Sequence, residues 1–260
     1  MLHHSPCVGD KENHVASIHL PQMLYIWPCI VFFSWPALLP SIARLSRKTL
    51  PRIPVALTIM GLMLLAVHLN TVIHPFTLAD NRHYVFYVFK ILLRHAVIKY
   101  ATVLVYFTCA WLVIDAMGGV PTRNESKVRQ KTKGDKGHGQ TPATRSVPED
   151  STRVSFVLVW LSATTLSLVT APLVEPRYFI IPWLVWRMNV PVDSRGEDSH
   201  DESEAKHKGV VSHTFSWVIS NRLWVETAWY TFVNFVTCYV FLYKGFEWPQ
   251  EPGNVQRFMW

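Results

Sequence analysis

The sequence predicts an all-α fold: a multi-pass transmembrane helical bundle with interfacial or re-entrant helices and long polar loops. Half of the 260 residues are hydrophobic, and the mean hydropathy is positive at +0.16 although the chain carries 25 basic and 18 acidic side chains. The apolar residues form five runs that contain only two charges, Lys99 and Asp115. Each run is close to the roughly 20 helical residues that cross a bilayer's hydrocarbon core, which excludes a soluble globular protein. The predicted spans are 23–43, 53–73, 97–117, 154–171 and 227–243.

Composition argues against several other classes of protein. The four cysteines form no CxxC pair, and no DxD pair or cluster with metal-ligand spacing is visible, so we expect no disulfide framework, no metal and no cofactor. The net charge of +7 lies in short loops beside the predicted spans, where it favours a membrane-orientation signal over nucleic-acid binding. The polar leader, residues 1–22, lacks the basic and apolar parts of a signal peptide.

The region 23–117 begins with a span that contains Pro28, Pro36 and Pro40, so we expect a kinked helix there. Four basic residues lie within 44–52, which places that loop in the cytosol. The second span then returns to the lumen.

An amphipathic luminal helix is expected over 78–95, because this stretch is too charged to span. Thr77 and Asp80 fit a capping box at its start. Helical spacing places polar side chains on one face and apolar side chains on the other. The polar set is His83, Tyr87, Lys90 and Arg94, and the apolar set is Val85, Phe89 and Leu92.

The second half of the chain begins with a basic loop, 118–153, whose composition is typical of cytosolic disorder. The region 154–190 holds a span and then a segment of about fourteen residues, short for a full crossing and predicted to be a luminal re-entrant or interfacial helix. An acidic loop, 191–225, leads to the last span and tail, 226–260. If the short segment crosses completely, the acidic loop becomes cytosolic and the C-terminus luminal.

The first candidate binding site consists of Asp80, Asn81, Arg82 and His83. These side chains could grip a lipid-linked phosphate at the membrane surface, where Arg supplies a planar fork and His a titratable donor. The alternative is a capped amphipathic helix that lies on lipid headgroups and does no chemistry.

The second candidate binding site is Glu175-Pro176-Arg177-Tyr178, directly after an uncharged span. Proline disfavours the α region for Glu175 and suits the first helical position itself. An ion pair between Glu175 and Arg177 would anchor the following helix. Alternatively, ionisable groups at membrane depth mark a substrate pathway. By contrast, His68 and Asn70 are expected to be interhelical hydrogen-bond partners.

Two stretches carry a family resemblance: HPFTLADNRHYVFYVFK and LVEPRYFIIPWLVWRMNV. Together they resemble the C-terminal part of the endoplasmic reticulum dolichyl-phosphate-glucose α-1,2-glucosyltransferases, which add the last glucose to the lipid-linked oligosaccharide of N-glycosylation. The resemblance covers roughly residues 23–243, except for the loops at 118–152 and 191–221.

This resemblance implies a multi-pass membrane transferase of the glycosyltransferase C superfamily in the endoplasmic reticulum, with a luminal active site. Its partners would be a lipid-linked donor, dolichyl phosphate glucose, and a lipid-linked oligosaccharide acceptor. Because the donor is β-linked and the product α-linked, the transfer would invert, with a carboxylate base and cations that stabilise the departing phosphate. Under this reading Arg82, His83 and Arg177 contact phosphate or glycan, and Asp80 and Glu175 orient them or contact sugar hydroxyls.

Members of this family also have a long N-terminal portion whose first luminal loop holds acidic residues thought to include the catalytic base. We expect this chain to begin after that portion, so the catalytic base is unassigned and the catalytic set incomplete. The alternative is a non-enzymatic regulatory or interaction protein of the membrane with the same fold.

Overall fold

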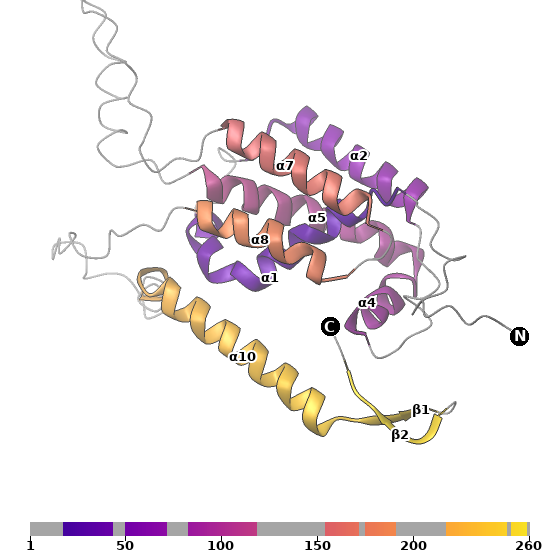
Figure 1. Cartoon of the computed structure of the whole chain (residues 1–260). Coiled ribbons are helices and arrows are strands. Elements are labelled where there is room, and N and C mark those ends of the chain that lie inside the picture. Colours follow the sequence, from indigo (N-terminus) through magenta and orange to yellow (C-terminus); the bar gives the residue numbers. More distant parts are fainter. Residues whose placement is uncertain are drawn as a thin grey trace, which may run out of the picture.

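The computed structural model describes residues 18–43, 50–71, 83–118, 154–171, 175–190, 217–248 and 251–258. These residues form a helical bundle with one short β-hairpin near the C-terminus (Figure 1). The helices are α1 (Gln22–Ala43), α2 (Ile53–Asn70), α4 (Tyr84–Leu92), α5 (Ala96–Met117), α7 (Val154–Val169), α8 (Arg177–Asn189) and α10 (Arg222–Tyr243). The strands are β1 (Phe246–Trp248) and β2 (Glu251–Gln256), which pair antiparallel.

The all-α prediction is confirmed, and each of the five apolar runs forms a helix close to its expected bounds. Among the residues described, three helices are long and apolar enough to cross a membrane: α1, α2 and α5. α7 is apolar but has only 16 residues. α10 has 22 residues, but its first turns carry Arg222 and Glu226, which are both buried. Crossing by α7 and α10 stays a prediction.

The expected kink in α1 is confirmed, and the prolines explain it. Ser34 leaves the helical region with φ −119° and ψ 24°. Proline has no N–H, so Pro36 cannot donate to the carbonyl of Phe32 one turn earlier. That carbonyl instead accepts a hydrogen bond of 2.8 Å from the indole Nε1 of Trp229 on α10. The bend in α1 thus creates an attachment point for another helix.

The core of the bundle lies around α1, which contacts α5, α7, α8 and α10 (Figure 1). Ile30, Leu38, Val113 and Leu168 are fully enclosed in it. Trp186 of α8 is also fully buried, and its indole Nε1 donates to the carbonyl of Val113 at 3.0 Å. Tryptophan provides a large apolar surface together with one polar donor, which suits such helix contacts.

α2 packs beside α5 with most of its apolar surface exposed, and Val67 is its one buried residue. The Nδ1 atom of His68 and the hydroxyl of Tyr100 on α5 share a hydrogen bond of 2.9 Å. Asn70 accepts a hydrogen bond of 2.6 Å from the backbone N–H of Leu20. His68 therefore forms the predicted interhelical hydrogen bond, whereas Asn70 bonds to Leu20, which precedes α1.

The described residues show that the predicted luminal segment 78–95 is not one continuous helix. His83 has an extended backbone (φ −89°, ψ 135°), so α4 begins at Tyr84. His95 is also extended (φ −143°, ψ 136°) and caps α5. Of the predicted polar face, only Tyr87 and Lys90 lie within α4, while Phe89 on the apolar face is buried as expected.

The short segment before the acidic loop forms α8, a helix of 13 residues with Pro182 inside it. A helix this short does not cross a bilayer, which agrees with the predicted re-entrant or interfacial character; its depth and side of the membrane stay predictions.

The β-hairpin of β1 and β2 was not predicted. Gly253 (φ 90°) lies in β2, a conformation that L side chains rarely adopt. Phe258 after it packs on Tyr84 of α4, with ring centroids 6.1 Å apart.

Several predictions concern residues outside the described ranges. They are the structures of residues 1–17, of the basic loop at 119–153 and of most of the acidic loop at 191–216, and the capping box of Thr77 and Asp80.

Candidate functional site

Of the first candidate site, the described residues include only His83. Asp80, Asn81 and Arg82 lie outside them. His83 is the residue before the first turn of α4, and Tyr84 follows it at the edge of an apolar pocket. The binding role of this motif stays a prediction.

The second candidate site is described completely and is built at the start of α8. Glu175 and Pro176 accept backbone hydrogen bonds from Tyr178 and Phe179, at 3.1 Å and 3.0 Å, which begin the helix. The carboxylate of Glu175 forms an ion pair with Nε of Arg177. The guanidinium carbon of Arg177 also lies 5.5 Å from the ring centroid of Tyr178, within cation–π range.

The ion pair predicted between Glu175 and Arg177 is therefore present. The Arg177 side chain is 69% exposed and that of Glu175 is 28% exposed. The hydrogen bond with Tyr178, followed by the charge of Glu175, raises the pKa of Arg177 above its ordinary value, so the guanidinium stays cationic. The ion pair uses the Nε atom, and an exposed arginine offers further donors to an anion.

These residues border a pocket of about 480 Å³ between α1, α8 and α10, called the α8–α10 pocket below. Its floor is mainly apolar and aromatic, as small-molecule sites usually are. Four polar side chains line it, two at the start of α8 and two on α10. They are Glu175, Arg177, Tyr230 and Asn234.

A second pocket of about 400 Å³ adjoins the first and lies between α1, α4 and α5, called the α4–α5 pocket below. Cys29, Phe33, Pro176 and Phe179 line both pockets. The α4–α5 pocket is almost wholly apolar, with Val85, Phe89 and Leu92 of α4 among its lining residues. Tyr84, which directly follows the first candidate site, therefore lines the same pocket as Pro176 at the start of α8.

This arrangement suits an amphiphile. A hydrocarbon chain would fit the apolar walls, because burying apolar surface away from water is favourable. An anionic headgroup would meet Arg177 at the rim, where arginine binds phosphate oxygens with a planar fork. Within the described residues, no three His, Cys, Asp or Glu side chains lie close enough to hold a metal ion.

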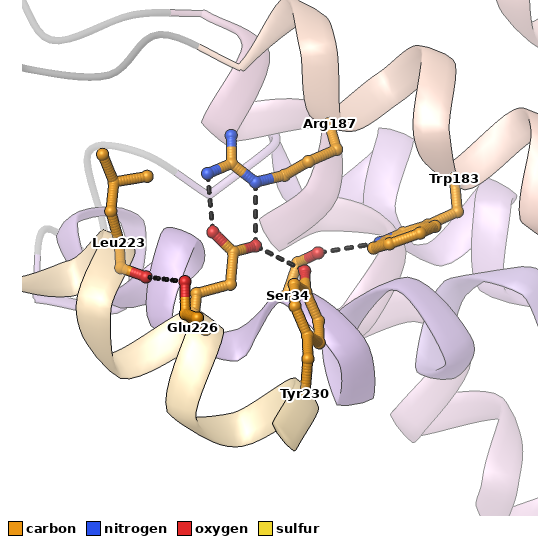
Figure 2. Close-up of polar contacts among 7 residues, drawn as sticks. Ser34, Trp183, Arg187, Leu223, Glu226 and Tyr230 are labelled. Atoms are coloured by element: carbon orange, nitrogen blue, oxygen red, sulfur yellow. Dashed lines mark hydrogen bonds and ion pairs between the residues drawn. The ribbon is translucent and has the colours of Figure 1, made fainter. Parts of the chain in front are cut away.

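A polar network next to the α8–α10 pocket was missed by the sequence reading (Figure 2). Arg187 of α8 donates from Nε and Nη2 to the two carboxylate oxygens of Glu226 on α10, at 2.8 Å and 2.6 Å. The hydroxyl of Tyr230 donates to the same carboxylate at 2.7 Å. These hydrogen bonds raise the pKa of Arg187 above its ordinary value. On the neighbouring turn of α8, Nε1 of Trp183 donates to Oγ of Ser34 at the kink of α1, at 2.8 Å.

This network fixes the walls of the α8–α10 pocket, because Trp183 and Tyr230 both line it. The side chains of Arg187 and Glu226 are 17% and 5% exposed, so their charges depend on each other. One feature of the sequence could have indicated this polar network. Glu226, Tyr230 and Asn234 follow at intervals of four, which forms a polar stripe on an apolar helix.

Comparison with known proteins shows which family this chain matches. A family model described as the DIE2/ALG10 family matches residues 1–188. The Aspergillus fumigatus protein named Dol-P-Glc:Glc(2)Man(9)GlcNAc(2)-PP-Dol alpha-1,2-glucosyltransferase is 43% identical over 97% of this chain and 52% of its own length. Proteins with the same name from Emericella nidulans and Mus musculus are 41% and 31% identical, over 98% and 97% of this chain and 52% and 42% of their own lengths. This chain thus spans about half the length of the curated relatives it matches, and no solved structure matches it.

Proposed function

Because this chain belongs to the DIE2/ALG10 family, we propose that it takes part in glucose transfer from dolichyl phosphate glucose to a lipid-linked oligosaccharide. The relatives' printed name describes an α-1,2-glucosyltransferase with these two lipid-linked substrates. The proposed location is the endoplasmic reticulum membrane, with the site on the luminal side.

The observation that carries this proposal is the α8–α10 pocket, an apolar space of about 480 Å³ with Glu175 and Arg177 at one wall. Dolichyl phosphate glucose combines a long hydrocarbon chain, a phosphate and a sugar. The apolar pockets would hold the part of the hydrocarbon chain nearest the phosphate, and Arg177 would bind the phosphate. Glu175 holds Arg177 through their ion pair, and so orients the cation.

The proposed transfer is a single inverting displacement. The bond between glucose C1 and the phosphate oxygen breaks as C1 bonds to the acceptor hydroxyl oxygen. A carboxylate base takes the hydroxyl proton, and dolichyl phosphate leaves with the electron pair. Arg177 would stabilise the charge that develops on the departing phosphate. Arg82 and His83 would contact phosphate or glycan, and Asp80 would orient these cations or contact sugar hydroxyls. Asn81 and Tyr178 are further proposed binding residues. The base is unassigned, and the proposed chemistry uses no cofactor or metal.

The test uses the chain in microsomes from cells that lack their own enzyme of this family. Dolichyl phosphate glucose labelled in the glucose is supplied, and the label on the lipid-linked oligosaccharide is counted before and after α-1,2-glucosidase digestion. A photoactivatable dolichyl phosphate glucose measures donor capture in the same membranes. We expect donor capture that unlabelled donor competes away. Label in the α-1,2-linked position is expected when the part of the Aspergillus fumigatus relative that this chain does not cover is co-expressed, because the chain spans about half of that relative's length.

Arg177→Ala should reduce donor capture about 10-fold to 100-fold, the usual range for a charge-assisted phosphate contact. Arg52→Ala is the matched control, because Arg52 precedes α2 and lines neither pocket. Capture without transfer in the co-expressing membranes would overturn the transferase part of the proposal in favour of the non-enzymatic alternative. Absence of both would overturn the donor site as well.

A further inference from the structure

A polar stripe on α10 faces the rest of the site. Glu226, Tyr230 and Asn234 are spaced by four residues, so they lie on one face of the helix. Figure 2 shows Glu226 and Tyr230 turned toward Arg187 and Trp183 of α8. Asn234 lies one turn further along this face.

The side chains of the first two members of the stripe are hydrogen-bonded within the fold, whereas that of the third has no such bond among the described residues. Glu226 is paired with Arg187, and Tyr230 donates to Glu226. For the side-chain amide of Asn234, the described part of the chain provides no hydrogen-bond partner, although its backbone carbonyl accepts from Thr237. Asn234 is exposed, so its amide is accessible to a ligand, and polar groups inside membrane helices usually face cavities or ligands.

Asn234 does face a cavity, since it lines the α8–α10 pocket together with Tyr230 and Val233. The opposite wall holds Glu175 and Arg177 at the start of α8. The pocket therefore has a charged wall and a neutral amide wall. An arginine matches the phosphate of a polyprenyl phosphate sugar, whereas an amide both donates and accepts, as sugar hydroxyls do.

From this geometry we infer that Asn234 is a binding residue for the sugar of a polyprenyl phosphate sugar held in the α8–α10 pocket. This inference rests on the proposed function, because it assigns a residue to the same donor. It assigns the phosphate to the α8 wall and the hydroxyls of glucose to the α10 wall. The network of Arg187, Glu226 and Tyr230 keeps the α10 wall in place.

The test compares two probes on the chain reconstituted in lipid nanodiscs: dolichyl phosphate glucose, and dolichyl phosphate, which lacks the sugar. The wild-type chain should bind the sugar-bearing probe more tightly. Asn234→Leu should weaken dolichyl phosphate glucose about tenfold, as expected for one or two lost neutral hydrogen bonds, and leave dolichyl phosphate unchanged. Asn234→Ala, which adds no bulk to the pocket, should do the same.

Thermal unfolding separates this role from a structural one. Replacing an unpartnered amide by an apolar side chain should leave the unfolding temperature unchanged or raise it. The control is Thr231→Ala on the same helix, because the Thr231 hydroxyl donates to the carbonyl of Thr227 and Thr231 does not line the pocket. Thr231→Ala should change the affinity for neither probe.

The possible results distinguish this inference from the function on which it rests. If the wild-type chain binds neither probe, the proposed function fails and the inference fails with it. If the wild-type chain binds both and the Asn234 variants bind both equally well, the inference alone is overturned. Equal weakening of both probes also overturns it, since the amide would then act on the phosphate or on the shape of the pocket.

Discussion

The pair of Arg187 and Glu226 offers the sharpest test of how the bundle is held together. Both charged side chains are largely buried, with exposed fractions of 17% and 5%. Two hydrogen bonds of 2.8 Å and 2.6 Å join them. Replacing Glu226 by Leu would leave the guanidinium of Arg187 without its anion. It would also remove the acceptor of the Tyr230 hydroxyl.

Removing one partner of a buried ion pair costs about 3–5 kcal/mol in unfolding free energy. Because part of Arg187 is exposed, we expect the lower end of this range, about 3 kcal/mol, for Glu226→Leu. For a domain of this size that corresponds to a fall of about 6–12 °C in the unfolding temperature. The double variant Arg187→Met with Glu226→Leu removes both charges, and should recover to within about 1 kcal/mol of the wild type.

The assay is thermal unfolding of the wild type, the two single variants and the double variant in one detergent, which completes a double-mutant cycle. Thr231→Ala serves as the control for a substitution elsewhere on α10. A loss below about 1 kcal/mol for Glu226→Leu would refute the reasoning, since the charge would then not depend on its partner. A double variant whose loss equals the sum of the single losses would refute it equally.

Two further predictions concern contacts around α1. Trp229→Phe should destabilise the chain by about 1 kcal/mol, because it removes the donor to the Phe32 carbonyl. In a Pro36→Ala background, where the backbone can satisfy that carbonyl, thermal unfolding should show a smaller effect, and an undiminished one would contradict this account. The second prediction uses the variant Cys7→Ser and maleimide labelling of the remaining cysteines. Dolichyl phosphate glucose should slow the labelling of Cys29, because Cys29 lines both pockets. It should leave the labelling of exposed Cys238 unchanged. Mass spectrometry measures both sites, and equal protection would contradict the assigned location.

The positions of the apolar helices could be predicted from the sequence because the cause is local. A long apolar run satisfies its own backbone hydrogen bonds as a helix, whatever its neighbours do. The kink of α1 was likewise local, because Pro36 removes its own donor. The pairing of Glu175 and Arg177 joins residues two apart, so the sequence alone suggested it.

Features that depend on distant packing were not predictable in the same way. Arg187 and Glu226 are 39 residues apart, and only the packing of α8 against α10 brings them together. The expectation of one continuous helix over 78–95 was wrong for a related reason, since His83 is extended. A capping motif indicates where a helix can begin, but the extended backbone of His83 makes the described helix begin at Tyr84. The pockets are formed by three or more helices each, so their existence required the structure.

The placement of α10 shows why polar contacts carry so much of this fold. Its buried residues are Arg222 and Glu226, whereas large apolar side chains such as Phe232 and Phe235 are exposed. In a membrane, lipid solvates apolar side chains about as well as a neighbouring helix does, so apolar packing selects a helix face only weakly. Directed hydrogen bonds from Trp229, Tyr230 and Arg187 select it instead. The same selection turns Asn234 toward the α8–α10 pocket, so the interactions that orient α10 also build the wall to which we assign the sugar.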